Sequence, residues 1–299
     1  MQHGVAEALK STNSLSGFLL NSFRTLNISF EPQWLLASAL NHKVKSVLNS
    51  CKTILFYALN VQLEEQMTQR IIPITSPNFI ADRTPDKPLD WPAIFGNDHP
   101  LALEIGCGIG HFILEQARKQ PEINFLAIDF YNKGCLKTCA KIDAAGLENV
   151  RVMRVEARWL LDKGLQPESL AAVYINCPDP WPKKRHRSRR LVNREFLLTL
   201  AQYLLPGGSF YFSTDFDNYA LDVAEQIRDL TGYRNMLQED LVTTLPGYPI
   251  SKYMQRFLDK KQKIYFIHHQ RDATIPRHEL PTPVAQSGYR FGWQKAQND

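Results

Sequence analysis

The stretch Leu101-Ala-Leu-Glu-Ile-Gly-Cys-Gly-Ile-Gly110 decides the fold of this chain, because an apolar run enters a turn with glycine at every second position. The run predicts a buried strand over 101–105, and a helix is expected from Gly110 to Gln120, where Pro121 ends it. Glycine lets the backbone turn sharply and approach a ligand with no Cβ in the way. These features predict the first strand, turn and helix of an α/β domain.

The same alternation of apolar runs and helical patterns continues to about residue 269. Six further strands are expected, over residues 124–129, 150–155, 171–176, 209–213, 236–242 and 263–268. Helices are expected over residues 133–145, from about 158, over 193–205 and over 217–230. Because helices that connect parallel strands cover both faces of a sheet, the pattern predicts a doubly wound, mostly parallel α/β sheet. Such sheets bind ligands at the carboxyl ends of their strands.

Composition excludes several classes of protein. Of the 299 residues, 44% are hydrophobic and 22% are charged, which suffices for a packed core and excludes wholesale disorder. Five cysteines without paired ligand spacing indicate a reducing compartment and argue against a structural zinc site. No apolar run approaches the ~18 residues of a membrane span, and no signal-peptide pattern opens the chain. We therefore expect a soluble cytoplasmic protein without a bound metal.

Four stretches of the chain differ in character. Residues 1–70 have poor periodicity and sparse charge, and one hypothesis is that translation starts at Met67, so that the preceding segment is not native. Residues 71–100 hold six prolines and predict an extended approach segment. Residues 101–270 form the expected α/β domain. Residues 271–299 place three prolines among polar residues and are expected to form a flexible tail.

Two acidic residues beside the glycine turn indicate what the turn binds. Asp129 ends the second strand nineteen residues past Gly110, where a carboxylate can hold two ribose hydroxyls. The spacing differs from the G-x-G-x-x-G pattern of dinucleotide sites, and Glu104 repels phosphate but suits a cationic ligand. S-adenosylmethionine has no phosphate and carries a sulfonium and an ammonium, so these residues favour it over NAD or FAD. The alternative is a tight glycine turn that binds no ligand.

Two further acidic residues follow the third and fourth strands, at the same edge of the predicted sheet. Glu156 stands where a carboxylate can accept a hydrogen bond from an adenine amino group, and a solvated surface carboxylate is the alternative. Asp179 lies within Pro178-Asp-Pro-Trp-Pro182, whose prolines fix the backbone and hold the carboxylate at the cofactor end of the sheet. Trp181 is expected either to stack on a base or to pack locally.

A basic run follows this turn directly. Six of the eight residues 183–190 are Lys or Arg, whereas the net charge of the whole chain is only +5. A charge run is usually a solvated face, but this one adjoins a rigid acidic turn beside the glycine loop. The combination predicts a surface that binds the phosphate backbone of a nucleic acid. His186 has no metal-ligating neighbours in sequence and is assigned to this surface.

Five segments carry a family resemblance: Glu104-Ile-Gly-Cys-Gly-Ile-Gly110, Pro178-Asp-Pro-Trp-Pro-Lys-Lys-Arg-His186, Arg189-Arg-Leu191, Pro206-Gly-Gly208 and Ser213-Thr-Asp215. With gaps, the chain resembles the bacterial tRNA (guanine-N7)-methyltransferase family from about Trp91 to His269. The glycine loop is common to many methyltransferases, whereas the Pro-Asp-Pro-Trp and basic segment is specific to this family. The resemblance implies a Rossmann-like class I methyltransferase with a seven-stranded sheet. It also implies S-adenosylmethionine as methyl donor and N7 of a variable-loop guanosine in tRNA as acceptor.

The resemblance also implies roles for individual residues. Cofactor binding is implied for four acidic residues and three loop glycines: Glu104, Asp129, Glu156, Asp179, Gly106, Gly108 and Gly110. Asp179 also corresponds to the family's proposed catalytic aspartate. Substrate contacts are implied for Lys183, Asp215, Ser251, Lys252, Tyr253 and Met254. RNA contacts are implied for Lys184, Arg185, His186, Arg187, Arg189 and Arg190.

Two positions depart from the family pattern. Glu156 replaces the usual aspartate and keeps the charge. The late motif, usually Thr-Lys-Phe-Glu, reads Ser251-Lys-Tyr-Met254 here, so Met254 replaces a substrate-side glutamate. A base contact from that position therefore lacks its carboxylate.

The implied reaction needs little acid–base chemistry. N7 of guanine already carries an in-plane lone pair, so placement against the methyl carbon is the main requirement. Positive charge then develops on the imidazole part of the base, where Asp179 is the candidate to stabilise it. Asp215 is expected either to accept the guanine N1 and N2 hydrogens or to cap the following helix. Lys183 and Lys252 are expected to hold a phosphate or to remain solvated.

Three other functions stay open on the sequence alone. They are another methyltransferase with a small-molecule or protein substrate, a non-catalytic RNA-binding relative, and an NAD-dependent oxidoreductase. The basic run argues against a small substrate, the glycine loop against a pure RNA binder, and Glu104 against NAD. The expected partner is tRNA, and neither a membrane nor an obligate protein partner is predicted.

Overall fold

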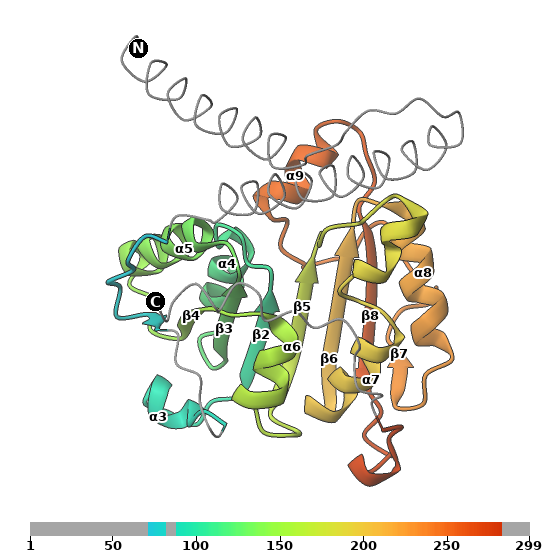
Figure 1. The fold of residues 1–299 in the computed structure, drawn as a ribbon, viewed down its shortest axis with the longest axis horizontal. Coiled ribbons are helices and arrows are strands. Elements are labelled where there is room, and N and C mark those ends of the chain that lie inside the picture. Colours follow the sequence, from blue (N-terminus) through green and yellow to red (C-terminus); the bar gives the residue numbers. More distant parts are fainter. Residues whose placement is uncertain (1–70, 82–87, 283–299) are drawn as a thin grey trace, which may run out of the picture. The chain divides into compact units, whose positions relative to one another are not determined.

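The structure, a computed structural model, describes residues 71–81 and 88–282. This part of the chain forms an eight-stranded sheet of order β1-β4-β3-β2-β5-β6-β8-β7 (Figure 1). Neighbouring strands are parallel from β1 through β6, whereas β8 runs antiparallel to β6 and β7. Helices pack on both faces, so the predicted doubly wound, mostly parallel α/β sheet is confirmed.

Most elements lie where the sequence predicts them. The strands are β1 Phe79–Ile80, β2 Leu101–Ile105, β3 Asn124–Asp129, β4 Val150–Arg154, β5 Leu170–Asn176, β6 Leu204–Thr214, β7 Tyr233–Asn235 and β8 Tyr265–Arg271. The α-helices are α3 Trp91–Phe95, α4 His111–Lys119, α5 Asn132–Ala145, α6 Ala157–Trp159, α7 Arg194–Tyr203, α8 Asp217–Arg228 and α9 Lys252–Leu258. Shorter turns are the π-helical η1 Leu160–Gly164 and the 3₁₀ turns η2 Lys184–Arg189 and η3 Arg277–Glu279.

The sheet has eight strands in the described residues, one more than the seven expected. The extra strand, β1, comes from the proline-rich segment and pairs in parallel with β4, Phe79 opposite Val152. The same segment also forms α3, whose first turn tolerates a proline because it needs no N–H donor there. The strand expected over 236–242 lies earlier, at β7, and Val242 makes only an isolated bridge.

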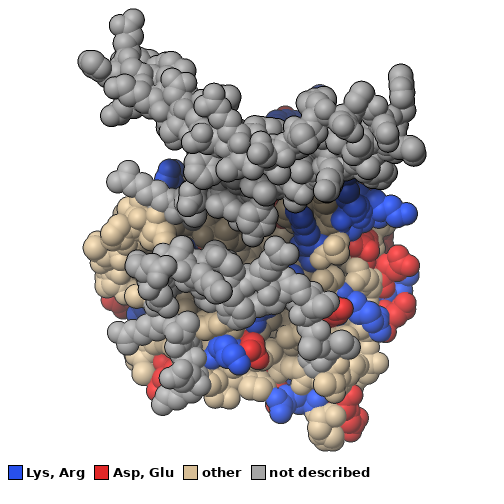
Figure 2. Space-filling view, viewed as in Figure 1, with Lys and Arg blue, Asp and Glu red and all other residues tan. Residues whose placement is uncertain are grey.

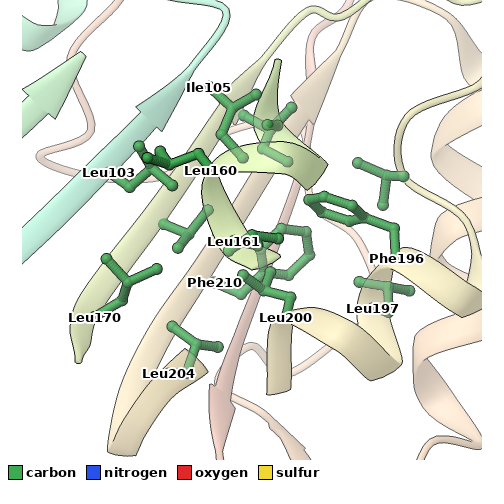
Figure 3. Packing of buried hydrophobic residues seen from close by; sticks show 14 of the residues in the cluster. Leu103, Ile105, Leu160, Leu161, Leu170, Phe196, Leu197, Leu200, Leu204 and Phe210 are labelled. Carbon is green, nitrogen blue, oxygen red and sulfur yellow. The ribbon is translucent and has the colours of Figure 1, made fainter. Parts of the chain in front are cut away.

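Each face of the sheet has its own apolar core. On one face α3, η1, α7 and α8 pack against β2, β5 and β6 through residues such as Leu103, Leu161 and Phe196 (Figure 3). On the other face α4 and α5 pack through residues such as Phe112. Because β2 is covered on both sides, all five of its residues are buried, which explains why every one except Glu104 is apolar.

The order of the sheet places a binding crevice at the carboxyl ends of β2 and β5. From β2 the chain adds β3 and β4 on one side, then returns to add β5 and β6 on the other, and ligands bind at such a reversal. The strand register places Glu104, Asn176 and Ser213 on the same face at this edge. Three neighbouring strands therefore end in polar side chains that share one face.

The chain beyond β8 packs against the domain as far as it is described. Arg271 is buried and forms an ion pair with Glu168 at 2.8 Å, and Leu280 is buried as well. The rest of the predicted tail, residues 283–299, and the N-terminal segment with Met67 lie outside the described residues. Within the described part, no helix combines the length and the apolar character that a membrane crossing requires.

Candidate functional site

Two adjoining cavities open at this edge of the sheet. The first, here called the Glu156 cavity, has a volume of about 450 Å³ and lies against Asp129 at the end of β3. The second, here called the Tyr253 cavity, has a volume of about 560 Å³ and lies between the glycine loop and α9. Both are lined by the same four residues, which form the boundary between them: Gly106, Asn176, Cys177 and Asp179.

The loop between β2 and α4 has glycine where its backbone demands it. Gly106, Gly108 and Gly110 have φ angles of 81°, 56° and 75°, in the left-handed region that other residues rarely adopt. No atom lies within 4 Å of the place where a Cβ would stand at Gly106 or Gly108, so the loop leaves room for a ligand. At Gly110 a Cβ would stand 2.6 Å from Thr138 Cγ2, because α5 packs directly on the loop.

Asp129 ties the end of β3 to this loop. Its Oδ2 accepts a hydrogen bond from the Gly108 N–H and its Oδ1 one from the Tyr131 N–H, both at 2.8 Å. Burial raises the pKa of Asp129 above its ordinary value, although these backbone hydrogen bonds oppose the shift. Asp129 lines the Glu156 cavity, and each of its carboxylate oxygens has a second lone pair that can accept a hydrogen bond. The geometry is compatible with the predicted contact to ribose hydroxyls.

Glu104 is buried with an incomplete set of partners. It is 2% exposed, and its Oε1 accepts only a long hydrogen bond, 3.4 Å, from Asn176 Nδ2. Its Oε2 has no partner among the described residues. Burial raises the pKa of Glu104 to about 8; the Asn176 hydrogen bond opposes the shift and repulsion from Asp129 adds to it. A cation in the Tyr253 cavity, which Glu104 lines, would stabilise the ionised carboxylate.

These residues fit S-adenosylmethionine. The unpartnered Oε2 of Glu104 is a buried acceptor that suits an ammonium group, and the glycine loop provides the open space that a ligand needs. Carboxylate acceptors beside an open glycine loop suit a nucleoside that carries positive charge and no phosphate. Elsewhere in residues 71–81 and 88–282, no group of three or more His, Cys, Asp or Glu side chains is arranged to hold a metal ion.

Glu156 lines its cavity as predicted, but it also caps a helix. Its Oε2 accepts hydrogen bonds from the backbone N–H groups of Arg158 at 2.7 Å and Trp159 at 3.1 Å, at the start of α6. The Arg158 guanidinium lies 3.7 Å from Oε1. Glu156 is therefore not a solvated surface carboxylate, and Oε1 is the oxygen that can still accept a hydrogen bond from an adenine.

Asp179 stands on the boundary between the cavities, in a turn that the surrounding structure enforces. Cys177 and Trp181 have φ angles of 46° and 42°, which cost energy in residues other than glycine. The turn is held at both sides: the Cys177 N–H donates to β6 at 2.8 Å, and Arg190 Nε donates to the Pro180 carbonyl at 2.9 Å. Asp179 itself is exposed, and no described residue donates a hydrogen bond to its carboxylate. That carboxylate is available to a ligand.

The basic run forms the 3₁₀ turn η2, and its side chains Lys184, Arg185, Arg187 and Arg189 are exposed. Figure 2 shows Lys and Arg side chains gathering at the upper right of the described part, where Figure 1 draws the segment between β5 and α7. Trp181 packs locally: the Arg189 guanidinium lies 4.9 Å from its ring centroid, and the His186 ring meets it edge-on at 5.9 Å. Of the two alternatives for Trp181, the structure shows local packing.

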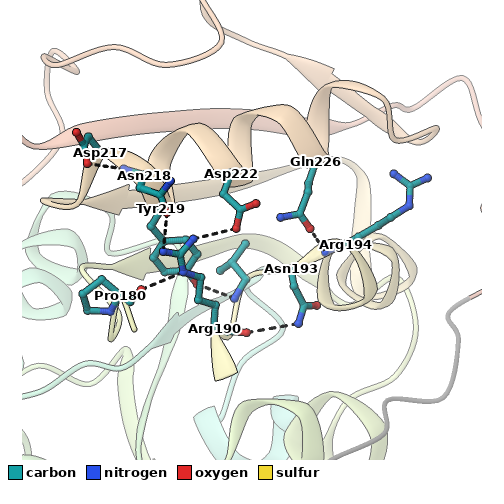
Figure 4. Close-up of polar contacts among 10 residues, drawn as sticks. Pro180, Arg190, Asn193, Arg194, Asp217, Asn218, Tyr219, Asp222 and Gln226 are labelled. Carbon is teal, nitrogen blue, oxygen red and sulfur yellow. Dashed lines mark hydrogen bonds and ion pairs between the residues drawn. The ribbon is translucent and has the colours of Figure 1, made fainter. Parts of the chain in front are cut away.

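The prediction that Arg190 contacts RNA is wrong. Its side chain is 1% exposed and points into the protein, where its guanidinium forms an ion pair with Asp222 at 3.0 Å (Figure 4). It also donates to Asn218 Oδ1 at 3.1 Å and to Pro180, and it lies 4.6 Å from the Tyr219 ring centroid. These contacts fasten the Asp179 turn to α8. Arg190 is therefore unavailable to RNA, unlike the exposed members of the run.

Helix α9 carries the late motif and divides its residues between two roles. Lys252 and Tyr253 line the Tyr253 cavity, and Tyr253 is 53% exposed. Ser251 also lines it and caps the helix, accepting the Met254 N–H at 3.1 Å. Met254 is 0% exposed and packs with Ile264 and Phe266, so the prediction that it contacts substrate is wrong. The apolar side chain anchors α9 instead.

Two predicted substrate residues lie outside the lining of both cavities. Lys183 is exposed just before η2, and Asp215 is half-buried after β6. Burial raises the pKa of Asp215. Helix α8 has no side-chain cap, which excludes the capping alternative for Asp215. The contacts of these two residues with substrate stay predictions.

Sequence reasoning missed three residues of the site. Asn176 Oδ1 accepts hydrogen bonds from Tyr248 Oη at 2.7 Å and from the β6 residue Ser213 at 2.9 Å, while its amide reaches Glu104. Its position at the end of a predicted strand is the sequence feature that could have identified Asn176 as a site residue. Arg256 and His111 line the Tyr253 cavity. Arg256 follows Lys252 by four residues on α9, and that spacing on one helix face could have found it.

Comparisons with known proteins agree with this site. Residues 98–267 match a family model described as a putative methyltransferase. With its doubly wound sheet and glycine loop, the chain is a Rossmann-like class I methyltransferase that uses S-adenosylmethionine as methyl donor. The tRNA (guanine-N(7)-)-methyltransferase of Syntrophotalea carbinolica is 53% identical over 230 residues, 76% of this chain and 98% of that protein. The chain belongs to the tRNA (guanine-N7)-methyltransferase family. A second member, from Geobacter metallireducens, is 53% identical over 206 residues, 69% of this chain and 98% of that protein.

Proposed function

We propose that this protein transfers the methyl group of S-adenosylmethionine to N7 of a guanosine in the variable loop of tRNA. The observation that carries the proposal is the place of Asp179. An exposed carboxylate stands on an enforced turn, between a cavity with cofactor-type residues and a cavity walled by α9. The names of the relatives at 53% identity support the same reaction.

The Glu156 cavity and the glycine loop would hold the cofactor. Asp129 would accept hydrogen bonds from the ribose hydroxyls, and Glu156 Oε1 would accept one from the adenine amino group. Glu104 lies where a positive charge on the ligand compensates its buried carboxylate. When bound, the cofactor supplies a methyl group on a positively charged sulfur.

The protein itself has to position the acceptor and stabilise charge. Guanine N7 carries a lone pair, so no side chain is needed to remove a proton. Positive charge develops on the imidazole part of the base, and the fixed carboxylate of Asp179 would stabilise it there. Holding the base in line with the methyl group contributes the rest, because orientation can lower a barrier by several kcal/mol.

The substrate side is formed by α9 and by the exposed basic run. The ring of Tyr253 is exposed in its cavity, and an exposed aromatic ring there suits stacking on a base. Lys183 and Asp215 would contact the target nucleotide from the ends of the neighbouring segments. The RNA backbone would contact the half-buried His186 and the exposed residues of the run: Lys184, Arg185, Arg187 and Arg189. As an enzyme that acts on tRNA, the protein would work in the cytoplasm.

The test is methyl transfer to a tRNA transcript that lacks modifications, using a cofactor labelled in its methyl group. We expect label in the tRNA and 7-methylguanosine after digestion to nucleosides. Asp179→Asn keeps the shape of the side chain and removes its charge, so turnover at saturating cofactor should fall about 100-fold. Glu279→Gln, at an exposed carboxyl in η3, is the matched control and should keep full turnover. Label in protein or small molecules but not in tRNA would contradict the proposal.

A further inference from the structure

The mouth of the Tyr253 cavity carries a second group of basic side chains, separate from the basic run. His111 begins α4, Lys141 lies on α5, and Lys252 and Arg256 lie one turn apart on α9. Three of them line the cavity, and the fourth, Lys141, places its Nζ 3.0 Å from His111 Nε2. Elements far apart in the sequence thus bring four basic side chains together. We call this group the α9 cation cluster.

Within the described residues, no carboxylate forms an ion pair with these side chains. Lys141 Nζ donates to the Ile109 carbonyl at 2.6 Å. The charges act on one another. Burial, then Lys141 and Lys252, lower the pKa of His111, and burial followed by Lys252 lowers the pKa of Lys141. The positive charges of Lys141, Lys252 and Arg256 are stabilised when an anion binds among them.

The position of the cluster favours a phosphate of the RNA as the anion. The basic run borders the Glu156 cavity through Arg189, whereas the α9 cation cluster borders the Tyr253 cavity. Asp179 lies on the boundary between the two. A strand whose target base enters at this boundary can therefore place phosphates on both basic surfaces.

We infer that His111, Lys141, Lys252 and Arg256 form a second phosphate-binding site for the RNA substrate, which holds the strand on the other side of the methylated nucleotide. The inference rests on the proposed function and adds to it a site for a phosphodiester group. The carboxylate of the cofactor is the other anion with matching chemistry. The experiment therefore measures tRNA and cofactor binding separately.

The deciding variant is Arg256→Gln, because Arg256 is exposed and donates no hydrogen bond to any described residue, so only its charge is lost. Lys141→Gln is the second variant. Arg118→Gln makes the same change at an exposed residue on the far end of α4 and serves as the control. Binding of tRNA is measured without cofactor over a range of salt concentrations. Arg256→Gln and Lys141→Gln should each weaken binding about 3- to 10-fold and reduce the slope of log K against log salt by about one. Arg118→Gln should leave both unchanged.

Affinity for S-adenosylhomocysteine, measured by calorimetry, should change less than about twofold in Arg256→Gln. Unchanged tRNA affinity and salt slope in both variants would overturn the inference. So would a loss of cofactor affinity with tRNA affinity retained, since the cluster would then serve the cofactor carboxylate. Lys141 also supports the glycine loop through Ile109, so Arg256 decides if the Lys141 variant unfolds. If the wild-type protein bound no tRNA, the proposed function itself would be wrong, and this outcome is distinguishable from a wild type that binds tRNA and variants that bind it equally well.

Discussion

Glu104 shows at the scale of one residue how a cofactor site differs from an ordinary core. Folding removes its carboxyl group from water and provides only one long hydrogen bond, so the empty protein holds the group protonated up to a pH of about 8. A cationic ligand reverses this preference, because the ionised form then gains a partner. The carboxyl group therefore weakens the empty protein and favours the occupied one.

Glu104→Gln should change the pH dependence of stability in the absence of ligand. The folded pKa is raised from 4.5 to about 8, so the wild-type contribution is fully present below pH 4.5 and is lost as pH rises to about 8. Across that window the free energy of unfolding of the wild type should fall relative to that of Glu104→Gln, by at most about 1.4 kcal/mol per pH unit. Urea unfolding at several pH values measures the difference.

The matched control for this change is Glu115→Gln on α4, at a half-buried glutamate that pairs with Lys119. Its stability should run parallel to that of the wild type over the same pH range. Glu104→Gln should also bind S-adenosylmethionine at least ~10-fold more weakly, because a cationic ligand loses its charged partner. Parallel pH profiles for Glu104→Gln and the wild type would show that the carboxyl group is not held protonated.

Single residues also show what the sequence could and could not reveal about the site. Glu104, Asp129 and Asp179 were predictable because each acidic residue lies at or just after the end of an apolar strand. The inward direction of Arg190 and Met254 was not, because it depends on contacts with other elements of the fold, α8 for Arg190 and the start of β8 for Met254. Because residues next to each of them in sequence are exposed, the local sequence predicts exposure for Arg190 and Met254 as well.

At the scale of elements, the glycine loop and α5 act as one unit. Gly110→Ala would place a Cβ 2.6 Å from Thr138 Cγ2 in a left-handed backbone conformation, so the loop or the Thr138 side chain must shift. We expect cofactor affinity to fall at least ~10-fold, because the loop would no longer follow the ligand. Calorimetric titration with S-adenosylhomocysteine measures the effect.

The control is Gly146→Ala at the end of α5. Gly146 has a φ of 61°, but no atom lies within 4 Å of the place that a Cβ would take, so the backbone penalty is similar and the clash is absent. This variant should lose about 1 kcal/mol of stability and keep its cofactor affinity. Equal cofactor affinities for the two variants would show that the loop tolerates displacement.

The segment after β5 combines a structural arginine with exposed ones, and two variants separate them. Arg190→Gln should reduce the free energy of unfolding by about 2–3 kcal/mol, since it breaks a buried ion pair whose partner Asp222 is 40% exposed. Arg187→Gln should leave stability unchanged and weaken tRNA binding several-fold. Thermal unfolding and tRNA binding measure both effects. If Arg190→Gln kept its stability but bound tRNA more weakly, Arg190 would be part of the RNA-binding surface after all.

The elements themselves were largely predictable, and the exceptions have a physical cause. β3 and β5 are long apolar runs, and Asn193 marks the start of α7 by accepting the Phe196 N–H at 2.9 Å. β1 and β7 have only two and three residues, so their sequences show little alternation. They form because a neighbouring strand offers unpaired backbone groups, which is a property of the assembled sheet.

At the scale of the whole molecule, tRNA binding should depend more on where the positive charges lie than on the net charge. Replacing Lys184, Arg185 and Arg187 together by Gln should weaken tRNA binding at least ~10-fold and flatten its salt dependence. Replacing Arg118, Arg234 and Arg277 by Gln removes the same net charge from exposed positions away from both cavities and should change neither. Similar salt slopes for the two triple variants would indicate non-specific attraction.

If Asp179 faces a guanine whose N7 takes the methyl group, two transcripts that differ only at that atom should react differently. A tRNA transcript made with guanosine should accept labelled methyl groups, whereas the same transcript made with 7-deazaguanosine has carbon at that position and no lone pair. We predict that the second transcript binds with the same affinity, as a competition assay would show, and accepts no label. Equal methylation of both transcripts would contradict the account.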